Sequence, residues 1–214
     1  AQPVRVEGAG AAHNFPTARA DAANCGTSEP PYLGACDFDA TRELLAHLYG
    51  ELAPNAASGV DGAGAPQSPA AGSRAGEAHD VPLREFDQRP YARASGSAGL
   101  DDRGFIFVPR GCEGNGRAGG QGARSDEGDR MQGPQSCRLH VVFHGCRQGV
   151  EGVGDAFVRR AGYLEVAEAN RIVVLFPQVK PTTLPLNPMG CWDWWGYEGE
   201  DYDTRAGKQV AAVR

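Results

Sequence analysis

The sequence contains no uncharged apolar run long enough to cross a bilayer and no charged-then-apolar leader. Its longest apolar stretches, such as Ile172–Phe176, have the length of a buried strand. An excess of positive charge is also missing: the 214 residues carry a formal net charge of −6, which argues against a nucleic-acid partner. We therefore expect neither a membrane span nor nucleic-acid binding.

The six cysteines show no Cys-x-x-Cys spacing, so we expect no zinc site, no redox dithiol and no cofactor. An even number of cysteines instead indicates disulfides formed in an oxidising compartment, so we predict a secreted protein. Fifteen connectivities are possible for six cysteines. We favour pairs that are neighbours in sequence, because each bond would brace a loop. These pairs are Cys25 with Cys36, Cys112 with Cys137, and Cys146 with Cys191.

Two segments have too few large apolar residues to contribute to a core. Residues 54–80 consist mostly of Ala, Gly, Ser and Pro, and residues 113–136 are rich in Gly and in charges of both signs. Such compositions predict flexible, solvated insertions.

The remaining chain predicts an α/β protein. Leu139–Cys146 reads as a strand, Val153–Asn170 as a helix interrupted at Gly162, and Arg171–Phe176 as the next strand. A strand, a helix and a strand within about forty residues form a right-handed parallel crossover. The helix should turn Phe157, Leu164 and Ala167 inward. Upstream, Gly104–Pro109 is predicted as a strand. Asp37–Gly50 is predicted as a helix that ends at Gly50 and has Phe38, Thr41, Leu45 and Leu48 on one face.

The end of the predicted strand, His144-Gly145-Cys146, has the composition of an oxyanion-binding turn. Glycine lets the backbone approach a substrate, and the amide that follows can point at a developing negative oxygen. Strand-Gly turns are common in α/β proteins, so an ordinary strand end is the alternative.

Among the histidines, His13 is the candidate for catalysis. It follows a predicted strand at Val4–Val6 and precedes Pro16, so it lies on a loop from which it can reach a nucleophile. The alternative is a surface histidine that caps a turn. His47 lies beside the apolar face of the predicted helix and is interpreted as structural, and His79 lies in the first insertion.

No serine of the chain occupies a nucleophile elbow. Ser95-Gly-Ser-Ala-Gly99 is similar to one, but Ser95 stands where Gly-x-Ser-x-Gly requires its first glycine. The motif occurs nowhere in the 214 residues, so we interpret Ser95–Gly99 as a loop.

All three tryptophans lie within Asn187–Tyr197. Three large rings within four residues cannot all be core, so at least one should line a surface that grips an apolar or ring-faced substrate. For Trp194 and Trp195, packing beneath the sheet is the open alternative.

Together, these segments resemble the catalytic domain of extracellular poly(3-hydroxybutyrate) (PHB) depolymerases, a circularly permuted α/β-hydrolase. The resemblance is carried by Gly10–Thr17, Phe105–Pro109, Cys137–Cys146, Ala161–Tyr163 and Asn187–Tyr197. It implies a mostly parallel sheet with flanking helices and braced by disulfides. It also implies that His13 is the triad histidine, that the backbone of Cys146 supplies an oxyanion amide, and that Trp192 helps to bind the polyester. A Cys146–Cys191 disulfide would then tie the oxyanion turn to the substrate-binding loop.

The order of the motifs leads to a further expectation. In an ordinary α/β-hydrolase the oxyanion turn precedes the serine, the acid and then the histidine. Here His13 precedes His144-Gly145, as the resemblance to the permuted family requires. The nucleophilic serine and the triad aspartate are therefore expected upstream of Ala1. Residues 1–214 would be the C-terminal portion of one catalytic domain, inactive on PHB or hydroxyalkanoate oligomers without its N-terminal part.

Two alternatives remain open. The first is a secreted esterase of the same fold that acts on feruloyl or acetyl groups of plant polysaccharide, because substrate choice depends on pocket shape. The second is a non-catalytic module whose tryptophan loop docks on a polymer or glycan.

Overall fold

The computed structural model describes residues 10–55, 83–113 and 136–214. Almost all of the two predicted insertions, 54–80 and 113–136, lies outside these ranges, as do Val4–Val6 and His79. None of the helices within the described ranges has the length and apolarity that a membrane span needs.

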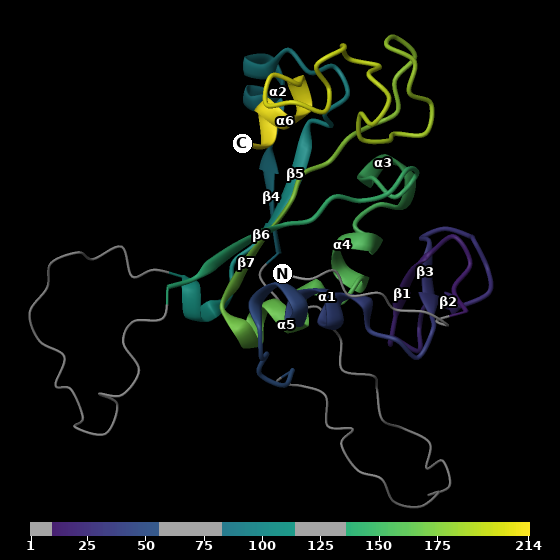
Figure 1. The fold of residues 1–214 in the computed structure, drawn as a ribbon, viewed down its shortest axis with the longest axis vertical. Helices are drawn as coiled ribbons and strands as arrows, with labels where there is room; N and C mark the ends of the chain where they lie inside the picture. Colours follow the sequence, from purple (N-terminus) through teal and green to yellow (C-terminus); the bar gives the residue numbers. More distant parts are fainter. Residues whose placement is uncertain (1–9, 56–82, 114–135) are drawn as a thin grey trace, which may run out of the picture.

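A four-stranded mixed sheet forms the centre of the molecule (Figure 1). In the order β4-β5-β7-β6, it contains β4 (Leu83–Asp87), β5 (Arg103–Phe107), β7 (Ile172–Phe176) and β6 (Arg138–Val141). β5 pairs antiparallel with both β4 and β7, whereas β6 pairs parallel with β7. The parallel crossover predicted between β6 and β7 is therefore confirmed.

The strand before the crossover is shorter than predicted, because β6 ends at Val141 and not at Cys146. The amide of Val142 still donates to the carbonyl of Leu175, at 2.9 Å. β7 then reaches Pro177, which has no N–H to extend the ladder. The residues after Val142 are thus released from the sheet and form the turn that carries the candidate site.

The crossover contains three short helices where one interrupted helix was predicted: α3 (Val150–Val153), α4 (Ala156–Arg160) and α5 (Tyr163–Asn170). Gly154 and Gly162 have φ angles of 62° and 89°, which break the helical path at two points and not one. The predicted inward residues Phe157, Leu164 and Ala167 are buried.

The core lies between the sheet and the helices α1 and α5. α5 packs on β7, and α1 (Ala40–Tyr49) packs on α5. Thr41 and Leu45 of α1 are fully buried, as predicted, and the amide of Gly50 caps the helix by donating to Ala46. Leu48, on the same predicted face, is 53% exposed. Only the part of the apolar face around Thr41 and Leu45 is therefore covered by the rest of the protein.

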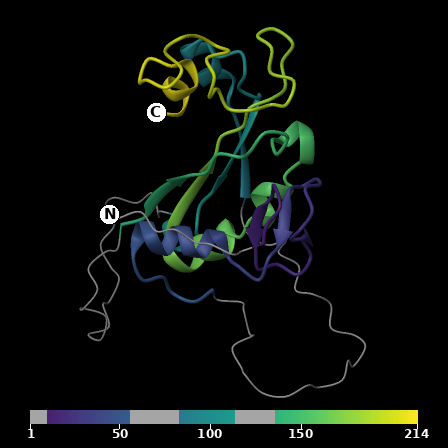
Figure 2. The same ribbon diagram turned by 45° about the vertical axis from the view of Figure 1, so that its right-hand side comes forward.

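A second, all-parallel sheet flanks the lower end of the main one, in the order β1-β3-β2 (Figure 2). It consists of β1 (Phe15–Thr17), β3 (Leu33–Ala35) and β2 (Ala23–Asn24). Asn14 lies so close to Gly34 that a Cβ atom there would be 2.5 Å from its Oδ1. This packing fixes the residue that follows His13.

The opposite end of the main sheet carries α2 (Arg89–Ser95), α6 (Lys208–Val213) and the long loops after β7 (Figure 1). The short 3-10 helix η2 (Arg110–Cys112) follows β5. Three disulfides brace the chain with the predicted pairing: Cys25–Cys36, Cys112–Cys137 and Cys146–Cys191.

Candidate active site

The turn after β6 is shaped by the buried His144. Its Nδ1 lies 2.7 Å from the carbonyl of Gly145, and its Nε2 accepts from the amide of Val179 at 3.1 Å. Only the neutral ring with the proton on Nδ1 satisfies both contacts. Burial also lowers the pKa of His144, which keeps the ring neutral. His144 therefore holds the turn in place and is not accessible as a catalytic base.

The amide of Cys146 differs from the amides of Gly145, Arg147 and Gln148. Gly145 N–H donates to Oε1 of Gln148 at 2.9 Å, Gln148 N–H donates to the carbonyl of Gly145 at 3.1 Å, and Arg147 N–H donates to the carbonyl of Met189 at 2.7 Å. Within residues 10–55, 83–113 and 136–214, the amide of Cys146 has no acceptor. One N–H of the turn is thus available for a developing negative oxygen.

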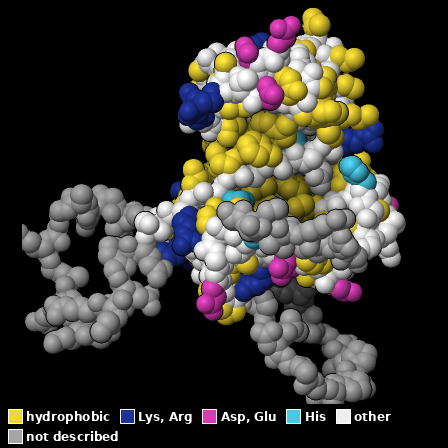
Figure 3. Space-filling view, in the orientation of Figure 1, with side chains coloured by type: hydrophobic (Ala, Val, Ile, Leu, Met, Phe, Trp, Pro, Cys, Tyr) yellow, Lys and Arg dark blue, Asp and Glu magenta, His cyan; other side chains and the backbone are white. Residues whose placement is uncertain are grey.

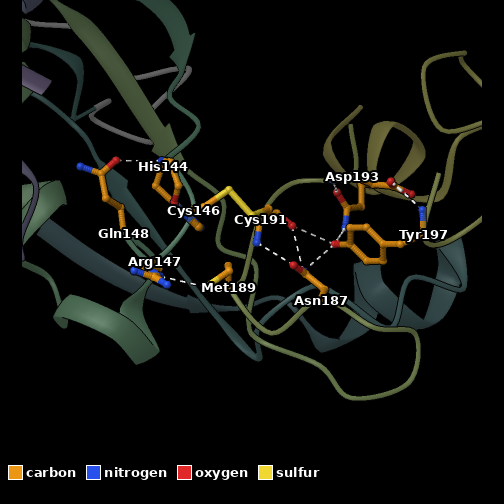
Figure 4. The surroundings of a disulfide bond; sticks show 11 residues. His144, Cys146, Arg147, Gln148, Asn187, Met189, Cys191, Asp193 and Tyr197 are labelled. Atoms are coloured by element: carbon orange, nitrogen blue, oxygen red, sulfur yellow. Dashed lines mark hydrogen bonds between the residues drawn. A yellow bond between two sulfur atoms is a disulfide. The ribbon is translucent and has the colours of Figure 1, made fainter. Parts of the chain in front are cut away.

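The Cys146–Cys191 disulfide joins this turn to the loop of residues 187–198 (Figure 4). Asn187 is fully buried and holds both backbone polar groups of Cys191: its Oδ1 accepts from the amide and its Nδ2 donates to the carbonyl, each at 2.9 Å. The oxyanion turn and this loop therefore form one cross-linked unit.

Asp193 and Tyr197 order the rest of the loop. The Asp193 carboxylate accepts from the amides of Gly196, Tyr197 and Glu198 at 2.7, 2.9 and 2.9 Å. Burial raises the pKa of Tyr197 to about 12, so its hydroxyl stays protonated and donates to the carbonyl of Cys191 at 2.9 Å. The loop is held by its own side chains in a defined shape (Figure 4).

Trp192 lies across the strand end that leads into the turn. Its ring meets that of Phe143 edge-on, with centroids 4.8 Å apart, and lies 6.0 Å from that of His144. The Nε1 atom is buried and has no acceptor in the described part of the chain. Trp194 and Trp195 are 69% and 41% exposed, so packing beneath the sheet, the alternative left open for them, is wrong.

His13 lies on an exposed loop held by backbone contacts. Its amide donates to Oγ of Ser28 at 2.8 Å, and Nδ2 of Asn14 donates to the carbonyls of Cys25 and Thr27, also at 2.8 Å. The Cys25–Cys36 disulfide closes the same loop. The imidazole of His13 has no hydrogen-bond partner among the described residues, which leaves both ring nitrogens accessible.

One cavity of about 300 Å³ brings His13 and Cys146 together, although they lie 133 positions apart in the sequence. Aromatic rings form much of its wall: Phe15, Tyr32, Phe143 and Phe157. Trp192 lines a neighbouring cavity of about 590 Å³ that shares Phe143. Hydrophobic side chains form a band across the middle of the face in Figure 3. A histidine, an unpaired backbone amide and apolar walls thus share one region, which are the groups that acyl transfer needs.

The loop Ser95–Gly99 serves a different purpose. Oγ of Ser97 donates to the buried carboxylate of Glu198 at 2.8 Å, and the amides of Ala98 and Gly99 donate to it at 2.6 and 2.7 Å. No imidazole takes part. The prediction of a loop is confirmed for residues 96–99, whereas Ser95 is the last residue of α2. The loop anchors residues 187–198. Within the described ranges, no cluster of three His, Cys, Asp or Glu side chains has the arrangement of a metal site.

Sequence reasoning missed the polar residues that support the site, above all Gln148, Asn187 and Asp193. Each makes hydrogen bonds to backbone groups three or more positions away. A polar residue three positions after a turn glycine, as Gln148 is after Gly145, was the available signal.

Comparison with characterised proteins supplies relatives, although no family model matches the chain. It is 33% identical over 191 residues to the poly(3-hydroxybutyrate) depolymerase of Delftia acidovorans, covering 89% of this chain and 30% of that protein. It is 28% identical over 215 residues to the polyhydroxybutyrate depolymerase of Talaromyces funiculosus, covering 95% and 52%. The chain thus spans about a third to a half of these relatives.

Solved structures agree with the sequence matches. The crystal structure of a PHB depolymerase from Penicillium funiculosum superposes with a TM-score of 0.69 at 27% identity, covering 95% of this chain and 55% of that one. A serine-to-alanine variant of a PHB depolymerase, complexed with an R3HB trimer, gives a TM-score of 0.70 with the same identity and coverage. The chain has the α/β-hydrolase fold of these enzymes, as the sequence predicted.

Proposed function

We propose that this chain, whose homologues and structural neighbours are PHB depolymerases, is the histidine-bearing part of a secreted serine esterase. Its substrate is PHB or a related hydroxyalkanoate ester. The observation that carries the proposal is the cavity shared by His13 and the unpaired amide of Cys146. A module that only binds polymer has no need of this pair.

In the proposed reaction, a serine outside these 214 residues attacks the ester carbonyl and His13 accepts its proton. The amide of Cys146 stabilises the negative oxygen of the tetrahedral intermediate, by about 3 kcal/mol for such a donor. Protonated His13 then donates to the leaving alkoxide, and a water molecule activated by His13 hydrolyses the acyl-enzyme. A carboxylate, also outside the chain, orients the imidazole.

The walls of the site fit an aliphatic polyester. Phe15, Phe143 and Phe157 offer apolar surface to the methyl and methylene groups of a hydroxybutyrate unit. Trp192 lines the neighbouring cavity and extends the apolar surface beyond Phe143. It is therefore placed to contact the next hydroxybutyrate unit of the polyester. Three disulfides fit a protein that works outside the cell.

The unpaired edge of β6 is where a second polypeptide segment could add to the sheet. Among the described strands, β6 pairs only with β7, and Leu139 on β6 and Phe143 just after it are 60% and 52% exposed. An open strand edge with large apolar residues is a site for further strand pairing. The part that bears the serine and the acid is proposed to complete the sheet there.

The test is complementation with a soluble 3-hydroxybutyrate trimer as substrate. The chain alone should show no turnover, and turnover should begin when it is refolded with the Gly-x-Ser-x-Gly-bearing part of its own domain. Replacing His13 with Gln should then lower kcat about a thousandfold. His47→Gln is the matched control, because His47 is also exposed but lies on α1, outside the cavity.

Two results would overturn the proposal: turnover by the isolated chain, or undiminished turnover by the complemented His13→Gln variant. Feruloyl and acetyl esters should be assayed in parallel. Faster hydrolysis of these esters than of the trimer would favour the plant-polysaccharide esterase. Adsorption to polymer that depends on Trp192 without any turnover would favour the binding module.

A further inference from the structure

We infer that Gln148 is a positioning residue that sets the separation between His13 and the oxyanion amide of Cys146. The inference rests on the proposed function and adds a residue to it. Gln148 lies on the turn itself, two positions after Cys146, and lines the cavity that contains His13.

The Gln148 side chain is only 8% exposed and uses both ends of its amide. Its Oε1 accepts from the amide of Gly145 at 2.9 Å, which braces the turn from within (Figure 4). Its Nε2 donates to the carbonyls of Pro31 and Tyr32 at 3.2 and 3.0 Å. Both Nε2 protons are therefore used, and the side chain has one defined orientation.

The hydrogen bond to Tyr32 connects Gln148 with the segment that carries His13. The carbonyl of Tyr32 also accepts from the amide of Phe15, at 2.8 Å. Phe15 begins β1, two residues after His13. A single carbonyl oxygen thus receives one hydrogen bond from the oxyanion side of the cavity and one from the histidine side.

This side chain bridges parts of the chain that the backbone does not join. No backbone hydrogen bond connects residues 143–148 with residues 10–35 of the described chain, and β6 and β1 belong to different sheets. A misplacement of about 1 Å between reacting groups costs about a hundredfold in rate. The bonds from Gln148 to Pro31 and Tyr32 hold that distance.

The chain offers a matched control in Gln88. Its Oε1 accepts from the amide of Gln178 at 3.0 Å, and its Nε2 donates to the carbonyls of Asp101 and Gln178, each at 2.9 Å. It is 1% exposed. Gln88 therefore has the same bonding pattern and burial, but it lies outside the cavity shared by His13 and Cys146.

The experiment compares Gln148→Met with Gln88→Met, because methionine keeps the length of the side chain and removes all three hydrogen bonds. A second variant, Gln148→Glu, keeps an acceptor for Gly145 but cannot donate to Pro31 or Tyr32. Each variant is assayed in the complemented enzyme for kcat and KM. The amide signals of Phe15 and Cys146 are followed by NMR in the 214-residue chain.

Both Gln148 variants should lower kcat about 10- to 100-fold with KM within about threefold of the original, and should shift the signals of Phe15 and Cys146. Gln88→Met should leave kcat and both signals close to the parent values. The inference is overturned if Gln148→Met shifts neither signal more than Gln88→Met does, or if the two variants have equal kcat. Absence of turnover in every complemented sample, parent included, would reject the proposed function. The NMR comparison would still decide whether Gln148 couples the two segments.

Discussion

The Cys146–Cys191 disulfide should contribute more to stability than the other two. The perturbation is Cys146→Ala together with Cys191→Ala, compared with Cys25→Ala together with Cys36→Ala. The two bonds close loops with sequence separations of 45 and 11 residues. The chain-entropy model then assigns about 4 kcal/mol to the first bond and about 3 kcal/mol to the second.

The assay is urea unfolding followed by circular dichroism and by tryptophan fluorescence. Fluorescence reports on the loop of residues 187–198, which holds all three tryptophans. In the variant without Cys146–Cys191, this loop keeps the hydrogen bonds of Asn187 and Asp193 but loses its covalent link to the oxyanion turn. The unfolding free energy should fall by about 4 kcal/mol, with the fluorescence transition at lower urea than the circular-dichroism transition.

A loss smaller than that of the Cys25/Cys36 variant would refute the loop-closure reasoning. It would mean that the segment between Cys146 and Cys191 is already confined in the unfolded ensemble without the disulfide. Alternatively, the disulfide would add little stability to the folded loop. Fluorescence and circular-dichroism transitions at the same urea concentration would refute the expectation that the loop of residues 187–198 unfolds before the rest of the protein.

Three further predictions concern the support of the site. Asp193→Ala removes an acceptor from three backbone amides and should lower the unfolding free energy by about 2 kcal/mol in urea titrations, without changing the fold seen by circular dichroism. Gly99→Ala places a Cβ 2.7 Å from the hydroxyl of Tyr197, so it should cost about 1 to 3 kcal/mol, and an unchanged melting temperature would contradict the packing described. Burial lowers the pKa of both His140 and His144, so the unfolded state binds more protons as pH falls below about 6.5. The unfolding free energy, measured by urea titration at several pH values, should therefore be highest above that pH and decrease below it. His144→Gln should weaken this pH dependence.

Much of the fold was readable from local patterns. Alternation at residues 139–142 and the apolar run of Ile172–Phe176 predicted the two parallel strands, because β-branched and apolar residues suit the pleated surface of a sheet. Only β7 is largely buried, whereas β6 is a more exposed edge strand. Gly50 and Gly162 marked helix ends because both have positive φ angles, which other residues adopt only with strain. The cysteine pairs followed from their order, because each cysteine is bonded to its neighbour in the sequence of cysteines.

The errors have a common cause, which is that burial depends on tertiary neighbours. Leu48 has the right spacing for the buried face of α1, but α5 and β1 cover only the part around Thr41 and Leu45. For Trp194 and Trp195 the sequence left burial beneath the sheet open, and the loop turns them outward, where their rings pack on each other with centroids 5.2 Å apart. Periodicity does not show how wide the covering surface is.

The sequence by itself determined the residue types of the site: a histidine on a short loop, a glycine turn at a strand end, and a tryptophan loop joined by cysteine. Each of these features depends on residues that are close together in the sequence, so a local sequence pattern can predict it. Only the tertiary structure decided that His13 and Cys146 face one cavity, that the amide of Cys146 is left without an acceptor among the described residues, and that Gln148 connects the two sides. Those relations depend on packing between segments more than a hundred residues apart, which no pattern of neighbouring residues encodes.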